Sequence, residues 1–357
     1  MSGPVNLFGL PLSRAVTALG GGTGTAGHLP RITRALYREA GRGPVELAAL
    51  AGRVSGLPRA LVGRLAEAFV LEEPRLVARQ DSAVDEGTVK LLFEAADGVR
   101  FESVLFRNRR RDTCRSLCLS TQAGCRIGCP FCATGRGRFE RHLTAAEMVA
   151  QYLQANRLVA ATERISNVVA MGMGEPLDNL DAVLDAISVF TDPAGVGLSA
   201  PRLVLSTAGH VPGLRRLAAL ALPIGLAVSL HAADDELRDR LVPLNRRYPL
   251  ADLMETLRLY PLRPGKWICF EYVLLSGVND SPRHAAMLGP LLAGLRALVQ
   301  VIAFNEVPGV PFSAPVTAQV RAFAEQVRAK GMPVAVRASR GPDIAAACGQ
   351  LRAHAGR

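Results

Sequence analysis

The stretch Cys118-Leu-Ser-Thr-Gln-Ala-Gly-Cys125-Arg-Ile-Gly-Cys129-Pro-Phe-Cys132 holds four of the seven cysteines of this 357-residue chain. Its last three cysteines form a Cys-x3-Cys-x2-Cys triplet on one short loop. Three thiolates so close in sequence can converge on one metal centre, either an iron–sulfur cluster or a zinc ion with a remote fourth ligand. A [4Fe–4S] cube has four irons, so three protein ligands leave one iron open for an exogenous molecule. The triplet therefore predicts a metal centre at Cys125, Cys129 and Cys132.

Beyond this loop the sequence alternates between strand-like and helix-like segments. The apolar, strand-like runs are residues 115–120, 167–171, 202–206, 225–229, 269–275, 299–304 and 333–337. Amphipathic segments of helix length lie between them at 181–190, 250–260, 281–298 and 314–330, and Thr144-Ala-Ala-Glu147 is a capping box that opens another helix. Repeated βα units predict a parallel sheet covered by helices. Six or seven such units favour an α/β fold of the partial (β/α)6 barrel type over a doubly wound sheet.

Polar residues and glycines recur where the apolar runs stop. In sequence order they are Gly172-Met-Gly-Glu175-Pro176, Ser206-Thr-Ala-Gly209, Ser229-Leu-His231, Ser276-Gly-Val-Asn279-Asp280 and Asn305. In a (β/α) barrel the active site gathers at the carboxyl ends of the strands. We therefore expect these segments to surround the cysteine triplet.

The part of the chain before the triplet has a different pattern. Residues 1–75 carry signals for short amphipathic helices. Two strand-like runs follow at 88–93 and 100–106, with Asp97-Gly98 between them as a hairpin requires. The sequence predicts a small helical accessory domain over residues 1–75, a short β-hairpin linker over 76–110, and a barrel core over 111–357.

The charge balance favours a polyanionic partner. Lys and Arg exceed Asp and Glu by 11, and the sequence pI is about 9.9, which favours nucleic acid ahead of a membrane surface. Arginines flank the cysteine loop at positions Arg107, Arg109, Arg110, Arg111, Arg136, Arg138 and Arg141. We interpret them as phosphate contacts, with an ordinary solvated charged face as the alternative, and expect an affinity for RNA that falls steeply with salt.

The expected cellular location follows from the cysteines and the hydropathy. The first residues do not read as a signal peptide, and no apolar run approaches the roughly 20 residues of a membrane-spanning helix. Clustered cysteines without secretory features are typical of reduced thiols engaged in metal or redox work. These features predict a cytoplasmic protein that does not associate with membranes.

Longer strings in the chain resemble one family. They are Cys118-Leu-Ser-Thr-Gln-Ala-Gly-Cys125, Met171-Gly-Met-Gly-Glu-Pro-Leu177, Leu205-Ser-Thr-Ala-Gly209, Ala227-Val-Ser-Leu-His-Ala232, Asp234-Asp-Glu-Leu-Arg-Asp-Arg-Leu-Val-Pro-Leu-Asn245, Phe270-Glu-Tyr-Val-Leu and Arg340-Gly-Pro-Asp-Ile-Ala-Ala-Ala-Cys348-Gly-Gln-Leu351. The triplet and the Gly-Glu-Pro string resemble the radical S-adenosylmethionine (SAM) superfamily. Together the strings, over residues 85–352, resemble its RNA adenine methyltransferases, RlmN and Cfr, which methylate carbon 2 or carbon 8 of adenosine in large-subunit rRNA.

The resemblance implies a role for each matching residue. Cys125, Cys129 and Cys132 would hold a [4Fe–4S] cluster. The residues that would bind SAM are Gly174, Glu175, Ser206, Ser229, Leu230, His231 and Asn305. The residues that would act on the substrate are Cys348, Cys118 and Glu102, the last as a proton acceptor.

The resemblance also implies a relay mechanism with two SAM molecules per turnover. One SAM would methylate Cys348, and the second would be cleaved reductively to a radical that activates the S-methyl group. The methylene carbon would then join the adenine ring. Cys118 would help to remove the ring proton and release the adduct, which leaves a Cys118–Cys348 disulfide bond. The implied partners are RNA, with 23S rRNA as the first candidate and tRNA as a second, and an external electron donor such as flavodoxin.

Two alternatives stay open on the sequence. One is methylation of carbon 8, which confers resistance to ribosome-targeting antibiotics. The other belongs to a different class: an iron–sulfur sensor that binds nucleic acid without catalysis. The Cys348 string and the complete set of SAM-site strings argue against a sensor.

Overall fold

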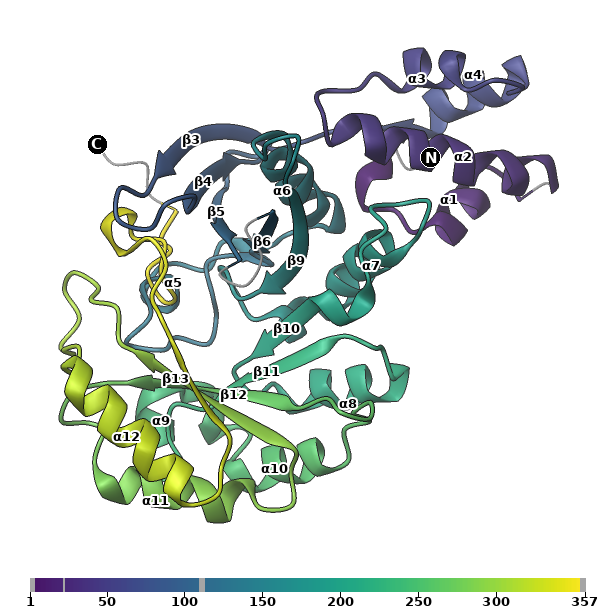
Figure 1. Ribbon diagram of the computed structural model, residues 1–357. Helices are drawn as coiled ribbons and strands as arrows, with labels where there is room; N and C mark the ends of the chain where they lie inside the picture. Colours follow the sequence, from purple (N-terminus) through teal and green to yellow (C-terminus); the bar gives the residue numbers. More distant parts are fainter. Residues whose placement is uncertain (1–3, 22, 109–112, 354–357) are drawn as a thin grey trace.

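One ten-stranded sheet forms the frame of the protein. The computed structural model describes residues 4–21, 23–108 and 113–353. Within them the strand order of this sheet is β14-β13-β12-β11-β10-β9-β6-β5-β4-β3. Figure 1 shows the sheet curving around an interior that the C-terminal segment enters. The two edge strands of the sheet, β14 and β3, do not pair with each other, so the barrel is open.

Seven consecutive parallel strands make the barrel part of this sheet. They are β6 (Cys114–Cys118), β9 (Arg164–Ala170), β10 (Leu203–Thr207), β11 (Gly225–Ser229), β12 (Ile268–Leu274), β13 (Ala297–Ala303) and β14 (Val334–Arg337). Each pairs in parallel with the next one along this series. All seven predicted runs lie on these strands, and the predicted partial barrel is confirmed.

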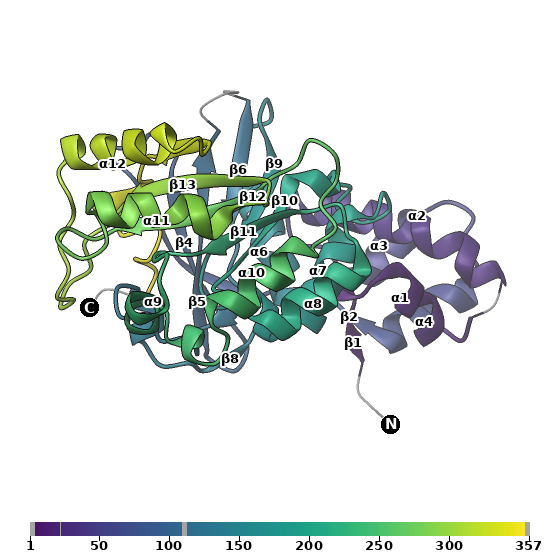
Figure 2. The same ribbon diagram turned by 90° about the horizontal axis from the view of Figure 1, so that it is seen from below.

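Helices cover the outer face of the barrel (Figures 1 and 2). They are α6 (Ala145–Arg157), α7 (Leu180–Thr191), α8 (Val211–Leu220), α10 (Leu250–Arg258), α11 (Pro282–Leu292) and α12 (Thr317–Ala329). The short helix α9 (Asp235–Leu241) lies instead at the carboxyl ends of β10 and β11, where its Arg238 binds the Ala208 and Ser229 carbonyls. The predicted capping box is present, because Thr144 accepts from the Glu147 backbone and Glu147 accepts from the Thr144 backbone. Among the helices of the described residues, none has the length and apolar character needed to cross a membrane.

Three differences from the predicted helices have local causes. The helix predicted over 281–298 ends at Leu292, because Gly294 has a φ of +79° and the backbone then turns into β13. Helices α8 and α9 were not predicted. Each is at most ten residues long, too short for a clear apolar periodicity.

Three antiparallel strands extend the barrel sheet beyond β6. They are β3 (Arg75–Asp81), β4 (Val89–Glu94) and β5 (Arg100–Arg107). The hairpin expected at Asp97-Gly98 joins β4 and β5, with Gly98 at a φ of +81°. Strand β3 was not predicted, because it is an edge strand rich in charged residues. Since β5 pairs with β6, the hairpin continues the barrel sheet; the domain boundaries at residues 75 and 110 stay a prediction.

The N-terminal residues form a helical lobe beside α6 and α7 (Figure 1). Its helices are α1 (Leu12–Ala18), α2 (Thr23–Ala40), α3 (Leu47–Arg53) and α4 (Arg59–Ala68), and the short strands β1 (Val5–Asn6) and β2 (Phe69–Val70) pair in parallel. Leu29, Ile32, Leu36, Leu50 and Leu65 are fully buried within the lobe. The amphipathic segments of residues 1–75 thus pack their apolar faces against one another.

The lobe docks on the first turn of α6 through very close backbone packing. A Cβ atom built on Gly9 would lie 2.1 Å from the Ala146 nitrogen. The Tyr37 hydroxyl donates to the Phe8 carbonyl at 2.7 Å, which holds the segment before Gly9 in place. At the other face of α6, the Gln151 amide exchanges two 3.0 Å hydrogen bonds with the backbone of Ser120. Helix α6 therefore connects the lobe to the end of β6.

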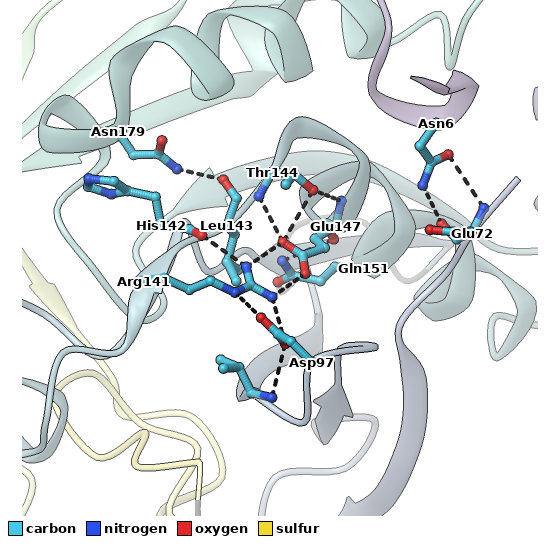
Figure 3. A network of polar contacts seen from close by, with 11 residues as sticks. Asn6, Glu72, Asp97, Arg141, His142, Leu143, Thr144, Glu147, Gln151 and Asn179 are labelled. Atoms are coloured by element: carbon cyan, nitrogen blue, oxygen red, sulfur yellow. Dashed lines mark hydrogen bonds and ion pairs between the residues drawn. The ribbon is translucent and has the colours of Figure 1, made fainter. Parts of the chain in front are cut away.

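Ion pairs join the hairpin to the same helix (Figure 3). Arg141, on the short strand β8 (Arg141–His142) that pairs with β7 (Gln122–Ala123), contacts Asp97 at 2.6 Å and Glu147 at 2.7 Å. The carboxylates of Asp97 and Glu147 both raise the pKa of Arg141. Arg141 therefore has a structural role in joining the hairpin to α6.

On the lobe side of the same figure, the Asn6 side chain donates to the Glu72 carbonyl at 2.8 Å.

The close packing at Gly9 leads to a stability prediction. The change Gly9→Ala forces a methyl group into the backbone of α6, so we expect the free energy of unfolding to fall by about 1–3 kcal/mol. Gly63→Ala in α4 is the matched control, because nothing lies within 4 Å of its Cβ position and alanine favours helix. Chemical denaturation measures both variants. Equal stability of Gly9→Ala and wild type would contradict the close packing.

Candidate active site

A cavity at the carboxyl ends of the barrel strands gathers most of the predicted site residues. Its lining includes Cys125, Cys129, Cys132, Gly174, Glu175, Ser206, Ser229, His231 and Cys348. An adjoining pocket shares Cys132 and Cys348 with it and adds Cys118, Asn305 and Arg337. Leu230 and Glu102 line neither space. The structure therefore brings residues that are more than 220 positions apart in the sequence into one site.

The cysteine loop lies between β7 and the short helix α5 (Ala133–Arg136). Phe131 and Ala133 are buried in an apolar cluster against which Cys129 and Cys132 pack. Burial raises the pKa of the Cys125 thiol to about 12 and that of Cys129 well above its usual value. Neighbouring thiols of the triplet raise both pKa values further. The three thiols therefore ionise readily only when a cationic centre compensates them.

The donor set of this loop fits an iron–sulfur cluster. Among the described residues, no three His, Cys, Asp or Glu side chains are arranged to hold a single metal ion. The three thiols line one cavity. In a cluster each thiolate binds its own iron, so the ligands surround a cube instead of a single ion. Soft sulfur donors in an apolar wall are what such a cluster requires.

The loop after β9 holds a buried carboxylate against the cavity. Gly174 has a φ of +104°, and a Cβ atom there would lie 2.5 Å from the Gln122 Cβ, so only glycine fits. The Glu175 carboxylate accepts from the Ala208 nitrogen at 2.7 Å and from the Leu177 nitrogen at 3.1 Å. Burial nevertheless raises the pKa of Glu175 to about 7. A cationic group in the cavity would find a hydrogen-bond acceptor here.

A polar chain runs from the cavity to the adjoining pocket. The Ser206 hydroxyl donates to Glu271 at 3.0 Å, and Arg337 pairs with the other oxygen of Glu271 at 3.2 Å. Neither Glu271 nor Arg337 was singled out from the sequence. Both could have been: Glu271 is a charge within an apolar run, and Arg337 ends a predicted strand, where functional side chains of a barrel lie.

Residues 229–231, at the end of β11, contribute a neutral histidine to the cavity. His231 is buried with a φ of 59°, and its Nδ1 accepts from the Val273 nitrogen at 3.2 Å. Burial lowers the pKa of His231 to about 3, so the imidazole is neutral at physiological pH. Leu230 is fully buried behind the cavity, with its nitrogen donating to the Glu271 carbonyl at 2.9 Å. His231 therefore shapes the cavity as an uncharged ring.

The adjoining pocket places two thiols next to one guanidinium. Cys118, Cys348 and Arg337 all line it, and every cysteine of the chain is free. Burial raises the pKa of Cys118 to about 12 and also raises that of Cys348, while Arg337 opposes both shifts. The Asn305 amide donates to the Cys348 carbonyl at 3.1 Å, so Asn305 holds the Cys348 backbone from the end of β13. We name this space the thiol pocket.

Residues 339–353 cross the open mouth of the barrel and carry Cys348. The Gly349 carbonyl accepts from the Ala133 nitrogen at 2.7 Å, and the Leu351 carbonyl accepts from the Thr134 hydroxyl at 2.6 Å. Asp343 accepts from the Ser82 hydroxyl at 2.6 Å. This C-terminal segment is thus tied both to the cysteine loop and to the turn between β3 and β4.

Glu102 holds the end of the C-terminal segment. Its carboxylate accepts from the nitrogens of Arg352 at 2.8 Å and Ala353 at 3.1 Å, and it pairs with Lys90 at 3.2 Å. Glu102 is 2% exposed. On β5 it lies two residues before Val104, which pairs with Cys118 and lines the thiol pocket. Glu102 therefore lies beside the site, with its oxygens already engaged.

The predicted basic residues have different surroundings. Arg107 contacts Glu86 at 3.6 Å, and Arg141 belongs to the ion-pair network described above. Arg109, Arg110 and Arg111 lie outside the described residues. Arg136 and Arg138 are exposed and line a broad groove, together with Arg352. Thr134 lines both this groove and the thiol pocket, so the groove leads to the site. We name it the arginine groove.

Three comparisons relate the chain to known proteins. Residues 119–288 match the radical SAM superfamily. A dual-specificity RNA methyltransferase RlmN of Syntrophobacter fumaroxidans is 51% identical over 76% of this chain and 78% of that relative. A probable dual-specificity RNA methyltransferase RlmN of Moorella thermoacetica is 47% identical over 84% of this chain and 85% of that relative.

A solved structure resembles the whole fold. It is the crystal structure of a radical SAM methyltransferase from Sphaerobacter thermophilus, with a TM-score of 0.87 and 39% identity. The match covers 98% of this chain and 100% of that one. The similarity therefore includes the helical lobe as well as the barrel.

The raised pKa of Glu175 predicts a pH-dependent stability. The pKa of Glu175 in the folded protein, about 7, exceeds its ordinary value of 4.5, so the folded state holds this proton more tightly than the unfolded chain does. The stability that the bound proton contributes to the folded state is therefore fully present below about pH 4.5 and is lost as the pH rises through 7. Between pH 4.5 and 7.5 we expect the cluster-free wild type to lose about 3 kcal/mol more unfolding free energy than Glu175→Gln. Urea denaturation across this range measures it. Glu236→Gln, at an exposed carboxylate on α9, is the control; a pH slope of Glu175→Gln equal to that of wild type would contradict the prediction.

Proposed function

Because this chain belongs to the RlmN family of radical SAM RNA methyltransferases, we propose that it methylates carbon 2 of an adenosine in RNA. The observation that supports this most directly is the arrangement of Cys118, Cys348 and the cysteine triplet around two adjoining cavities, both of which Cys132 and Cys348 line. The relatives are named dual-specificity RNA methyltransferases, and on that basis we propose both 23S rRNA and tRNA as substrates. The reaction would take place in the cytoplasm.

The family implies a [4Fe–4S] cluster and SAM. We propose that Cys125, Cys129 and Cys132 hold the cluster and that Gly174, Glu175, Ser206, Ser229, Leu230, His231 and Asn305 form the SAM site. The cluster would supply one-electron cleavage of the SAM sulfonium, with the electron taken from an external donor such as flavodoxin. Glu175 would accept a hydrogen bond from the SAM ammonium group, and His231 would line the site as an uncharged ring. Leu230 contributes through its backbone, which fixes the end of β11.

The two thiols of the thiol pocket carry the methyl group and release the product. The Cys348 sulfur is the nucleophile that accepts a methyl group from a first SAM, so each turnover uses two SAM molecules. Reductive cleavage of a second SAM would remove one hydrogen atom from that S-methyl group, and the methylene carbon would bond to adenine. The adduct would then return one electron to the oxidised iron–sulfur centre and lose the ring proton, which Cys118 would help to remove. Attack of the Cys118 sulfur on the Cys348 sulfur would break the bond between Cys348 and the methylene carbon, that carbon would take a proton to become the methyl group, and an external thiol would reduce the resulting disulfide. Arg337 lies beside both sulfurs and favours their ionised forms.

Glu102 serves as the proton acceptor only after it changes partners. In the described arrangement its carboxylate binds the backbone of Arg352 and Ala353 and pairs with Lys90. A proton from the substrate would reach Glu102 once the backbone nitrogens of residues 352–353 no longer donate to its carboxylate oxygen. The C-terminal segment that carries Cys348 and the availability of Glu102 are then linked.

Three alternatives are less well supported. Methylation of carbon 8 would use the same cavity and thiols, and the relatives named RlmN favour carbon 2. A sensor that only binds nucleic acid would not require the Cys118 and Cys348 thiols beside the cavity, nor the polar chain of Ser206, Glu271 and Arg337. The zinc alternative is set aside because the superfamily match implies an iron–sulfur cluster.

Nucleoside mass spectrometry tests the proposed reaction. The anaerobically reconstituted protein is incubated with SAM, reductant and fragments of 23S rRNA or tRNA, and the RNA is digested. We expect 2-methyladenosine from both RNAs. A product with 8-methyladenosine would move the site of methylation, and intact SAM with unmodified RNA would contradict the proposed enzyme.

Cysteine variants test the relay in the same assay. We expect Cys348→Ala and Cys118→Ala each to lower the yield of methylated RNA by about 100-fold or more. Cys114→Ala is the matched control, because Cys114 begins β6 at the end opposite Cys118 and lines neither the cavity nor the thiol pocket. Methylated RNA formed by Cys348→Ala at the rate of wild type would show that Cys348 is not the methyl carrier.

The arginine groove is the proposed path of the RNA backbone. For the double variant Arg136→Ala/Arg138→Ala we expect the Kd for RNA to rise roughly threefold to tenfold. Because two phosphate contacts are lost, the slope of log Kd against log salt should fall by about 2. Arg258→Ala is the control, since Arg258 is exposed at the end of α10, where the chain leads to the amino end of β12. An unchanged slope in the double variant would place the RNA elsewhere.

A further inference from the structure

A single guanidinium joins the carboxyl ends of two barrel strands beneath the cavity. Arg238 of α9 is 1% exposed. Its Nη2 donates to the Ala208 carbonyl at 2.6 Å and to the Ser229 carbonyl at 3.3 Å, and its Nε donates to the Leu230 carbonyl at 3.2 Å. Its Nη1 donates to the Asn245 amide oxygen at 2.6 Å. All four acceptors are neutral, so hydrogen bonding is satisfied while the charge is not balanced.

The positive charge of Arg238 has no direct anionic partner among the described residues. The acidic groups closest to it along α9, Asp235 and Asp239, accept instead from the Asn245 amide at 2.8 and 2.7 Å. Burial lowers the pKa of Arg238 to about 10, which still leaves it protonated at physiological pH. A buried charge without a partner is costly unless an opposite charge is brought near it. Asp235 and Asp239 favour the protonated form of Arg238 without contacting it, and an anion in direct proximity would stabilise the charge further.

The cysteine loop is the neighbour that can supply this anion. Leu237 and Leu241 of α9 belong to the same apolar cluster as Phe131, and Cys129 packs against that cluster. Ala208 and Ser229, whose carbonyls Arg238 binds, line the same cavity as Cys129. Among the groups that raise the pKa of Arg238, Cys129 has the largest effect. Arg238 thus lies close to the Cys129 thiol.

We propose that Arg238 is a positioning residue whose charge balances the negative charge of the cluster bound to the cysteine triplet and raises its reduction potential. The inference rests on the proposed function, which assigns the cluster to Cys125, Cys129 and Cys132. A [4Fe–4S] core with two positive charges and three thiolates carries one net negative charge. One electron from the external reductant makes this two, with no bond formed or broken. A fixed positive charge nearby favours the more negative, reduced form.

Redox titration of reconstituted variants tests the role of this charge. The full-length wild type, Arg238→Gln, Arg238→Lys and the control Arg240→Gln are reconstituted anaerobically and titrated with dithionite in the presence of mediators. Arg240 is exposed on the same helix, so its replacement removes an equal charge at a distance from the cavity. We expect the cluster potential, followed by electron paramagnetic resonance, to shift to more negative values in Arg238→Gln. Arg238→Lys and Arg240→Gln should stay close to wild type.

Each outcome bears on the proposal. Equal shifts in Arg238→Lys and Arg238→Gln would assign the effect to the lost hydrogen bonds and overturn the role of charge. If Arg238→Gln binds no iron, the lysine variant decides: iron content and potential like those of wild type support the proposal, and loss of the cluster overturns it. If neither the wild type nor its Cys129→Ala variant contains iron after reconstitution, the proposed function is contradicted instead. The two failures are therefore distinguishable.

Discussion

The site depends on the way in which Ser120 anchors the end of β6. Ser120 is fully buried, and its backbone exchanges two hydrogen bonds with the Gln151 amide of α6. Its hydroxyl donates to the Glu102 carbonyl at 2.5 Å and accepts from the Met173 nitrogen at 2.7 Å. Every polar group of this residue is thus paired inside the protein, which makes each bond costly to break. Through it, β5, α6 and the loop after β9 are held against the strand that carries Cys118.

The charged groups around the cavity are stable only in combination. Burial raises the pKa values of the triplet thiols and of Glu175, and it lowers those of His231 and Arg238. Burial thus works against the charged form of each of these groups. A bound cluster would supply positive iron to the thiolates and a net negative charge for Arg238. The ammonium group of SAM would supply a positive charge next to the Glu175 carboxylate. The bound cofactors would therefore compensate the charges that burial disfavours.

The C-terminal segment brings Cys348 to the cavity at some conformational cost. Four of its residues have positive φ: Gly341, Ala345, Gly349 and Ala353. For the two alanines this backbone shape costs about 1–2 kcal/mol each. Hydrogen bonds to Ala133, Thr134 and Glu102 offset that cost. The position of Cys348 is therefore set by contacts with distant parts of the chain and not by local preference.

The sequence by itself determined the repeated βα pattern, the cysteine triplet and the strings that place Cys118 and Cys348 in one family, because those features are local in the chain. It could not show that β3–β5 extend the barrel sheet, since pairing across β5 and β6 depends on tertiary contacts. Nor could it show that Glu102 binds residues 352–353, 250 positions away. Arg238 and Glu271 lay within matched strings, yet only the folded chain revealed what they contact. Spacing predicts which residues can share a site; burial and hydrogen bonding, which are known only after folding, decide what each residue does there.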